Sequence, residues 1–81
     1  MNTTLYSEDK VLDCSGTLCP MPVIKTAMAI KDLHLGQILK MIATDPGSPL
    51  DIAAWARQTK NELLDSYQEG NKYIFFIRRA N

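Results

Sequence analysis

The stretch that decides the fold is Ile38–Ala43, which reads ILKMIA and is nearly continuous in apolar residues. A run of this kind is typical of a central strand with little exposed face. The turn signal Asp45-Pro46-Gly47 follows closely. We therefore expect a strand over residues 37–44, with the other elements arranged around it.

Two elements are predicted before this strand. Lys10–Cys14 has the short apolar character of a strand, which the sequence Ser-Gly-Thr at residues 15–17 interrupts. From Pro20 to about Leu33, apolar residues recur at three- and four-residue intervals, which predicts an amphipathic helix closed by Gly36. The apolar residues of this pattern are Val23, Ile24, Ala27, Met28 and Ile30.

Three elements are predicted after the central strand. A helix start is indicated by Ser48 as the cap, Pro49 at the first helical position and Asp51 returning the capping bond. The helix should end near residues 60–61, and two strands, 63–67 and 73–77, should follow. Gly70-Asn71 is a hairpin turn signal between them. The inner face of the second helix is expected to carry Ile52, Trp55, Ala56 and Thr59.

The predicted order is strand, helix, strand, helix, strand, strand. This order defines an α/β class, a two-layer βαβαββ sandwich with a four-stranded mixed sheet and both helices on one face. We expect residues 1–9 to form a flexible leader and residues 10–81 to form the single domain. Trp55, Met28 and Met41 are interpreted as core residues.

Composition excludes several classes of function. The 81 residues carry nine Lys or Arg and nine Asp or Glu, so no cationic excess supports direct nucleic-acid binding. The N-terminus lacks a signal peptide pattern, and no run is long enough for a membrane span, so we expect a cytoplasmic protein without membrane contact. Two cysteines and one histidine cannot complete a structural zinc site alone. No metal and no cofactor are expected.

The chemistry is predicted to lie in the motif Cys19-Pro20-Met21-Pro22. Prolines are tolerated in the first turn of a helix, because the amide hydrogens there have no intrahelical partner. Cys19 is therefore expected at the N-cap, where the helix dipole and the free amides of Met21 and Val23 would favour the thiolate. This pattern predicts a nucleophilic thiol.

The spacing of other residues narrows this chemistry. A thioredoxin-type dithiol needs its second cysteine three residues on, where Pro22 stands. His34 lies about 20 Å from Cys19 along the helix, too far for a Cys-His pair, and is expected to face solvent. Cys14, in the first strand, is interpreted mainly as a core residue, with a secondary role as a sulfur acceptor or oxidation-sensitive thiol left open.

Three functions remain open on these residues. The first is a sulfur carrier in which Cys19 holds a persulfide. The second is a non-catalytic regulatory or protein-binding module in which Cys19 is a structural helix cap. The third is a redox protein in which Cys14 resolves an oxidised Cys19.

With Asp13 and Gly16 ahead of Cys19-Pro20-Met21-Pro22, the chain resembles the TusA family, also called SirA-like or UPF0033. The resemblance implies the βαβαββ fold and a persulfide on Cys19, with Asp13, Gly16, Pro20 and Pro22 as supporting residues. It implies a relay component rather than a stand-alone enzyme.

The same resemblance implies the partners. The sulfur donor would be a cysteine desulfurase or a rhodanese-like protein. The acceptor would be DsrE-like or linked to heterodisulfide reductase. The sulfur would serve tRNA 2-thiouridine formation, molybdenum-cofactor assembly or dissimilatory sulfur oxidation. We expect the carrier itself to be a monomer.

Overall fold

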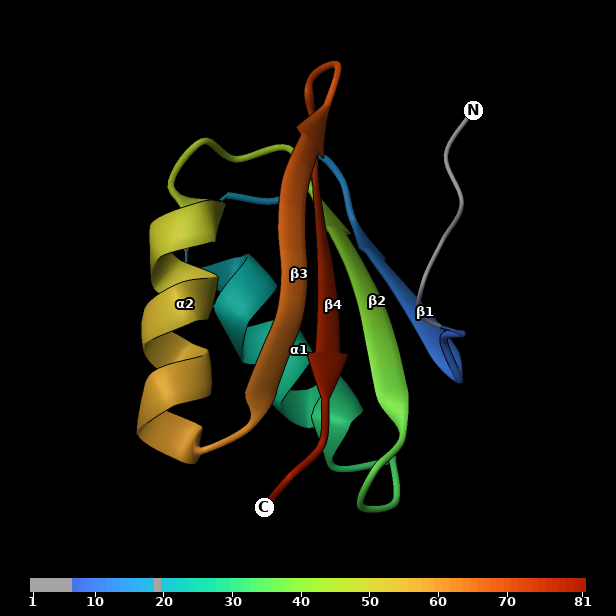
Figure 1. Cartoon of the computed structure of the whole chain (residues 1–81). Helices are drawn as coiled ribbons and strands as arrows, with labels where there is room; N and C mark the ends of the chain where they lie inside the picture. Colours follow the sequence, from blue (N-terminus) through green and yellow to red (C-terminus); the bar gives the residue numbers. More distant parts are fainter. Residues whose placement is uncertain (1–6, 19) are drawn as a thin grey trace.

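The computed structural model describes residues 7–18 and 20–81. The element order is the predicted one, strand-helix-strand-helix-strand-strand (Figure 1). The elements and their bounds are β1 (Lys10–Cys14), α1 (Met21–Ile30), β2 (Ile38–Ala43), α2 (Ser48–Thr59), β3 (Glu62–Glu69) and β4 (Lys72–Arg78).

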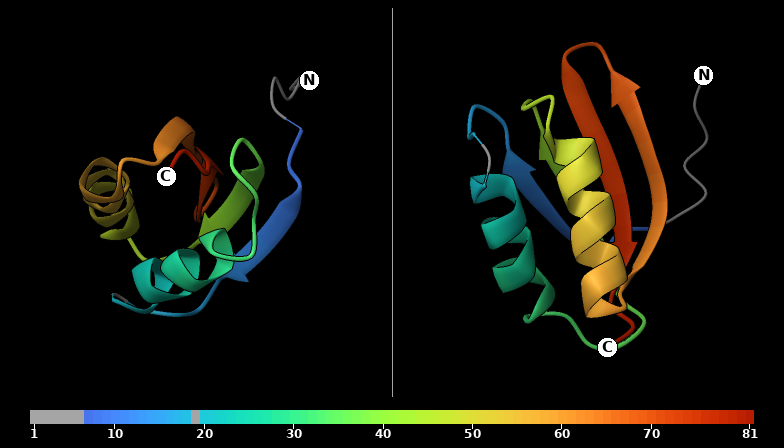
Figure 2. Two further views of the ribbon diagram at one scale, coloured as in Figure 1. Left: turned by 90° about the horizontal axis from the view of Figure 1, so that it is seen from below. Right: turned by 90° about the vertical axis from the view of Figure 1, so that its left-hand side faces the viewer.

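The four strands form one mixed sheet in the order β1-β2-β4-β3. β1 pairs with β2 in parallel, whereas β4 pairs antiparallel with both β2 and β3. Both helices pack on the same face of this sheet (Figure 2). The predicted two-layer architecture and the central position of β2 are therefore confirmed.

Different segments of the chain lie at the two ends of the strands. Because β1 and β2 are parallel, their carboxyl ends meet at one edge, and α1 and α2 both begin there (Figures 1 and 2). β4 runs the other way, so the C-terminal segment lies at the opposite end. There the backbone N–H of Gly36 donates to the Arg79 carbonyl (2.7 Å), and the Arg79 N–H donates to that of Gln37 (2.9 Å).

The core lies between the sheet and the helices. Leu39, Met41 and Ala43 alternate along β2, face the helices and are fully buried. They belong to one cluster with Phe75 and Ile77 of β4. The buried side chains that α2 adds to this cluster are Ile52, Trp55 and Ala56, as predicted. Thr59, also predicted on this face, is only half-buried.

The face that α1 buries differs from the prediction. Met28 was expected in the core but is 66% exposed, and Ile24 is also exposed. The helix buries Ile30, as predicted, together with Pro22, Thr26 and Ala29, which lay outside the predicted pattern. α1 is apolar over most of its circumference, so periodicity alone did not single out one face. Thr26 tolerates burial because its hydroxyl donates to the Pro22 carbonyl (2.7 Å).

The start of α2 also corrects a prediction. The N-cap residue is Gly47, and Ser48 is the first helical residue, with no side-chain capping bond. The Ser48 amide donates to the Asp45 carbonyl (3.0 Å), which places the serine inside the turn. A capping side chain requires non-helical backbone at its own residue, so the predicted capping box does not form. Within the described part of the chain, the buried Ser48 hydroxyl has no hydrogen-bond partner.

The substitution Ser48→Ala is expected to raise the free energy of unfolding by about 1 kcal/mol. It removes a buried hydroxyl that gains no bond on folding, and alanine favours helix. Urea unfolding at unchanged m-value would measure the gain. Ser66→Ala, at an exposed position of β3, is the control and should give none. A loss of about 1 kcal/mol for Ser48→Ala, as for a true cap, would contradict this interpretation.

The boundary between leader and domain stays a prediction. Residues 1–6 of the predicted leader lie outside the described residues. At Asp9 the chain is already joined to the sheet, because its amide donates to the Ile38 carbonyl (2.7 Å) and its carboxylate accepts from the Ile38 amide (2.8 Å).

Candidate functional site

The candidate site lies at the edge of the molecule where both helices begin. Cys19 itself lies outside the described residues. The site is therefore defined by the residues that lead into and out of the motif. Leu18 and Pro20 flank the cysteine in the chain, and both are exposed.

The loop ahead of the motif is held by its own hydrogen bonds. The Asp13 carboxylate accepts from the Ser15 amide (2.9 Å). The amide and the hydroxyl of Thr17 both donate to the Cys14 carbonyl, at 3.1 Å and 2.7 Å. Hydrogen bonds from the side chain and backbone of Ser15 lower the pKa of Asp13, so its carboxylate is ionised at neutral pH.

Gly16 ties this loop to the next one. Its amide donates to the hydroxyl oxygen of Thr44, which follows β2 (2.9 Å). Gly16 has a φ of +82°, a left-handed conformation that glycine adopts without a Cβ penalty. The loop that leads to Cys19 is thus joined to the loop that leads to α2.

The helix start lies one residue later than predicted. The N-cap of α1 is Pro20 and the first helical residue is Met21, so Cys19 precedes the cap, and its predicted position at the N-cap is wrong by one residue. The Met21 amide, which was expected to face the thiol, donates to the Leu18 carbonyl (2.9 Å). Pro22, at the second helical position, is buried. In the sequence, Cys19 stands two residues before the first helical residue of α1, the end at which a helix carries its positive pole.

Cys14 lies in the core. Its side chain is fully buried in the cluster beneath the helices. Burial is the main cause that raises the pKa of its thiol. Because the thiolate is the nucleophile in sulfur exchange, a buried thiol with a raised pKa is poorly suited to accept sulfur or to resolve a disulfide. The geometry favours the interpretation of Cys14 as a packing residue.

Other groups that the sequence raised lie elsewhere. His34 is exposed beyond the far end of α1, in agreement with the prediction. Within residues 7–18 and 20–81, no group of three or more His, Cys, Asp or Glu side chains lies close enough to hold a metal ion. None of the helices in the described part of the chain is long and apolar enough to cross a membrane.

Exposed apolar side chains form a stripe beside the motif. Leu18 precedes Cys19, and Met21, Ile24 and Met28 continue along the outer side of α1 at helical spacing. All four are exposed, Leu18 by 73%. Exposed apolar patches are a mark of protein interaction sites. We call these four residues the apolar stripe.

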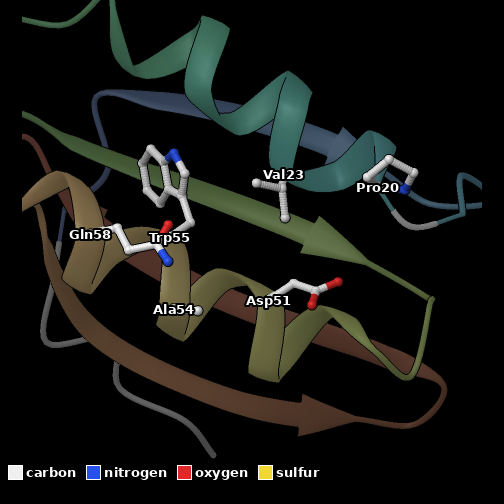
Figure 3. Close-up of a pocket in the computed structure, with 6 residues that line it drawn as sticks. All are labelled: Pro20, Val23, Asp51, Ala54, Trp55 and Gln58. Atoms are coloured by element: carbon white, nitrogen blue, oxygen red, sulfur yellow. The ribbon is translucent and has the colours of Figure 1, made fainter.

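A groove between the two helices was missed by sequence reasoning. It has a volume of about 250 Å³ and begins at Pro20 (Figure 3). Its lining residues are Pro20, Val23, Asp51, Ala54, Trp55 and Gln58. The one signal in the sequence was the spacing of Asp51, Ala54, Trp55 and Gln58, which places these residues on one side of a helix.

The fold and the candidate site together indicate a general class of protein. The chain is a small α/β domain with a cysteine motif at a helix start, an apolar stripe beside it, and its histidine at the far end. Such an arrangement suits a protein that presents a thiol to other proteins. The family model described as sulfurtransferase TusA matches residues 10–79, and the chain therefore belongs to the TusA family.

Similar proteins agree with this membership. The chain is 44% identical to the sulfur carrier protein TusA of Allochromatium vinosum, over 89% of this chain and 95% of that protein. It is 42% identical to a putative sulfur carrier protein, YrkI, of Bacillus subtilis, over 89% and 96% of the two chains. It is 45% identical to a putative sulfur carrier protein of Aquifex aeolicus, of which it spans 38%. The names of these relatives support a sulfur-carrier role.

A solved structure shares the fold. The crystal structure of a SirA-like protein from Desulfitobacterium hafniense superposes with a TM-score of 0.77 at 18% identity. The match covers 89% of this chain and 99% of the other. It supports the α/β architecture independently of close sequence similarity.

Proposed function

We propose that the chain carries sulfur as a persulfide on Cys19 and transfers it to a thiol of a partner protein. The observation that carries the proposal is the motif Cys19-Pro20-Met21-Pro22 at the start of α1 in a member of the TusA family. Asp13, Gly16, Pro20 and Pro22 support the motif by shaping the loop and the helix start around it.

The chemistry needs no cofactor. In loading, the Cys19 thiolate attacks the outer sulfur of a donor persulfide, the donor S–S bond breaks, and the donor cysteine leaves as a thiolate. In transfer, the acceptor thiolate attacks the outer sulfur on Cys19, and Cys19 leaves as a thiolate. Each step forms one bond to sulfur and breaks one, so neither an oxidant nor a reductant is consumed.

Retention of the sulfur follows from the surroundings of the motif. A nearby thiolate would attack the inner sulfur of the persulfide and release sulfide. Pro22 occupies the position of a resolving cysteine, and Cys14 is buried with a raised pKa. The bound sulfur is therefore kept until the thiolate of a partner reaches it.

The partners follow from the family. The donor is a cysteine desulfurase or rhodanese-like protein, and the acceptor is DsrE-like or linked to heterodisulfide reductase. The sulfur is used for tRNA 2-thiouridine formation or for dissimilatory sulfur oxidation. The apolar stripe supplies a docking surface, because partner proteins must approach Cys19 directly. The balanced charge supports protein contacts rather than direct nucleic-acid contacts. The carrier works in the cytoplasm as a monomer.

Loading by a cysteine desulfurase tests the proposal. The chain is incubated with the desulfurase, cysteine and pyridoxal phosphate, and its intact mass is measured. We expect a gain of one sulfur, ~32 Da, confined to Cys19 and removed by dithiothreitol, as thiolate chemistry requires. Cys14→Ala is the matched control and should load fully.

Two results would contradict the carrier function. One is an unmodified chain under conditions in which the desulfurase itself is loaded. The other is equal loading of Cys19→Ser. A Cys19→Ser variant that keeps all partner binding and cellular function would instead indicate a regulatory module with a structural cysteine.

A further inference from the structure

The groove between α1 and α2 lies beside the reacting end of the carrier. Pro20, which directly follows Cys19 in the chain, and Val23 of α1 line one side of it. Figure 3 shows the opposite wall, built by α2, with Trp55 between the two helices. A partner segment that brings its thiol to Cys19 must therefore come close to Pro20, which lines this groove.

The groove is lined mainly by apolar residues and carries a negative charge. Four lining residues, Pro20, Val23, Ala54 and Trp55, are apolar. The two polar groups are the carboxylate of Asp51 and the carboxamide of Gln58, and the described lining holds no cation. In Figure 3 the Asp51 carboxylate lies at the end of the groove nearest Pro20. The groove thus combines apolar walls with a negative charge close to the motif.

A second carboxylate adds to this charge. A Cβ atom built on Gly47 would lie 3.5 Å from an Asp45 carboxylate oxygen and 3.8 Å from one of Asp51. Both carboxylates therefore flank the same residue at the start of α2. Asp51 already takes part in an interaction within the chain, and a carboxylate has about four acceptor sites. A single interaction does not use all of these acceptor sites.

We infer that this groove receives a cationic side chain, arginine or lysine, that lies within a few residues of the acceptor cysteine. Long basic side chains bury an apolar stem and keep a charged head at a polar group. The stem would lie between Val23 and Trp55, and the head would reach Asp51. The inference rests on the proposed carrier function and adds a rule for recognition of the acceptor.

Synthetic acceptor peptides test this rule. Cys19 is loaded with sodium tetrasulfide, from which the thiolate takes one sulfur as trisulfide leaves, and loading is confirmed by mass. Three peptides are compared, and each contains one cysteine. They differ only at the two positions that lie two residues before and two residues after the cysteine. Both positions carry arginine in the first peptide, citrulline in the second and glutamate in the third. Citrulline keeps the size of arginine without its charge. The second-order rate of sulfur transfer to each peptide is measured by mass spectrometry.

We expect transfer to the arginine peptide to be about threefold faster than to the citrulline peptide, and slowest to the glutamate peptide. Asp51→Asn should remove the difference between arginine and citrulline. Asp32→Asn is the charge-matched control, since Asp32 pairs with Lys10 beyond the other end of α1 (3.0 Å), and should preserve it. Comparing ratios between variants cancels the intrinsic reactivity of each peptide.

A second variant allows the inference to be tested even if Asp51→Asn does not fold. Gln58→Lys places a cation in the groove at an exposed position and should reverse the preference toward the glutamate peptide. Equal transfer rates to all three peptides from a loaded protein would overturn the groove inference and leave the carrier function standing. An arginine preference that survives in both variants would also overturn it. Failure to load Cys19 at all would overturn the carrier function and the inference together.

Discussion

Leu39→Ala is expected to lower the free energy of unfolding by about 3–5 kcal/mol, the range found when a fully buried leucine is truncated. Leu39 lies in the central strand, is 0% exposed and pairs with Lys10 of β1 and Ile77 of β4. Neighbouring strands and two helices hold its surroundings in place, so the cavity cannot collapse freely. A domain of this length has about 4–12 kcal/mol in total, so the substitution should remove from about a quarter to all of its stability.

The chain provides a matched control for this substitution. Leu50, in the first turn of α2, is 80% exposed, and Leu50→Ala should change the free energy of unfolding by less than about 0.5 kcal/mol. Urea unfolding of both variants at equal m-value gives the comparison. Similar losses for the two variants would contradict the assignment of Leu39 to the core.

The stability of the fold is expected to fall at alkaline pH because of Cys14. Burial raises the pKa of this thiol above its ordinary value of 9.0. Below pH 9 both the folded and the unfolded chain keep the proton, so the thiol adds no pH dependence there. Between the ordinary pKa and the raised pKa only the unfolded chain loses the proton. Stability then falls by up to about 1.4 kcal/mol per pH unit.

Comparison with Cys14→Ala isolates this effect. The free energy of unfolding of both proteins is measured from pH 7 to pH 10. The wild-type value should decline more steeply above pH 9, whereas the variant lacks the group responsible. The pKa of the exposed Tyr67 is also raised, by partial desolvation and by the nearby carboxylates of Glu69, Asp65 and Glu8, but this tyrosine is present in both proteins and does not affect the difference. Parallel pH profiles would show that Cys14 ionises as readily in the fold as in the unfolded chain.

Much of the fold could be predicted because its strongest signals are local. The apolar run of β2 marked the centre of the sheet, and Gly70-Asn71 marked the hairpin between β3 and β4. The predictions were wrong where a local sequence pattern was compatible with two structures. α1 is apolar on several sides, so packing rather than periodicity selected the buried face that leaves Met28 exposed. At α2, backbone geometry gave Gly47 the capping position expected for Ser48.

The candidate site also has one part that could be predicted from the sequence and one part that could not. The motif that contains Cys19 is continuous in sequence and could be found by spacing. The groove could not, because it joins Pro20 and Val23 to residues of α2 about 30 positions further along the chain. Its existence depends on the distance between two packed helices, which no single segment encodes. The bond from Gly16 to Thr44 is of the same non-local kind.

The C-terminal segment lies at the end of the molecule away from the motif, where Arg79 pairs with Gly36 and Gln37 (Figure 1). A tether joined after Asn81 would therefore hold the domain at the end opposite the starts of α1 and α2. When the domain is attached in this way to a surface or to a second domain, the end at which α1 and α2 begin would stay accessible to a sulfur donor and then to a sulfur acceptor. Attachment at that end is accordingly the natural choice for measuring how partners compete for the loaded thiol.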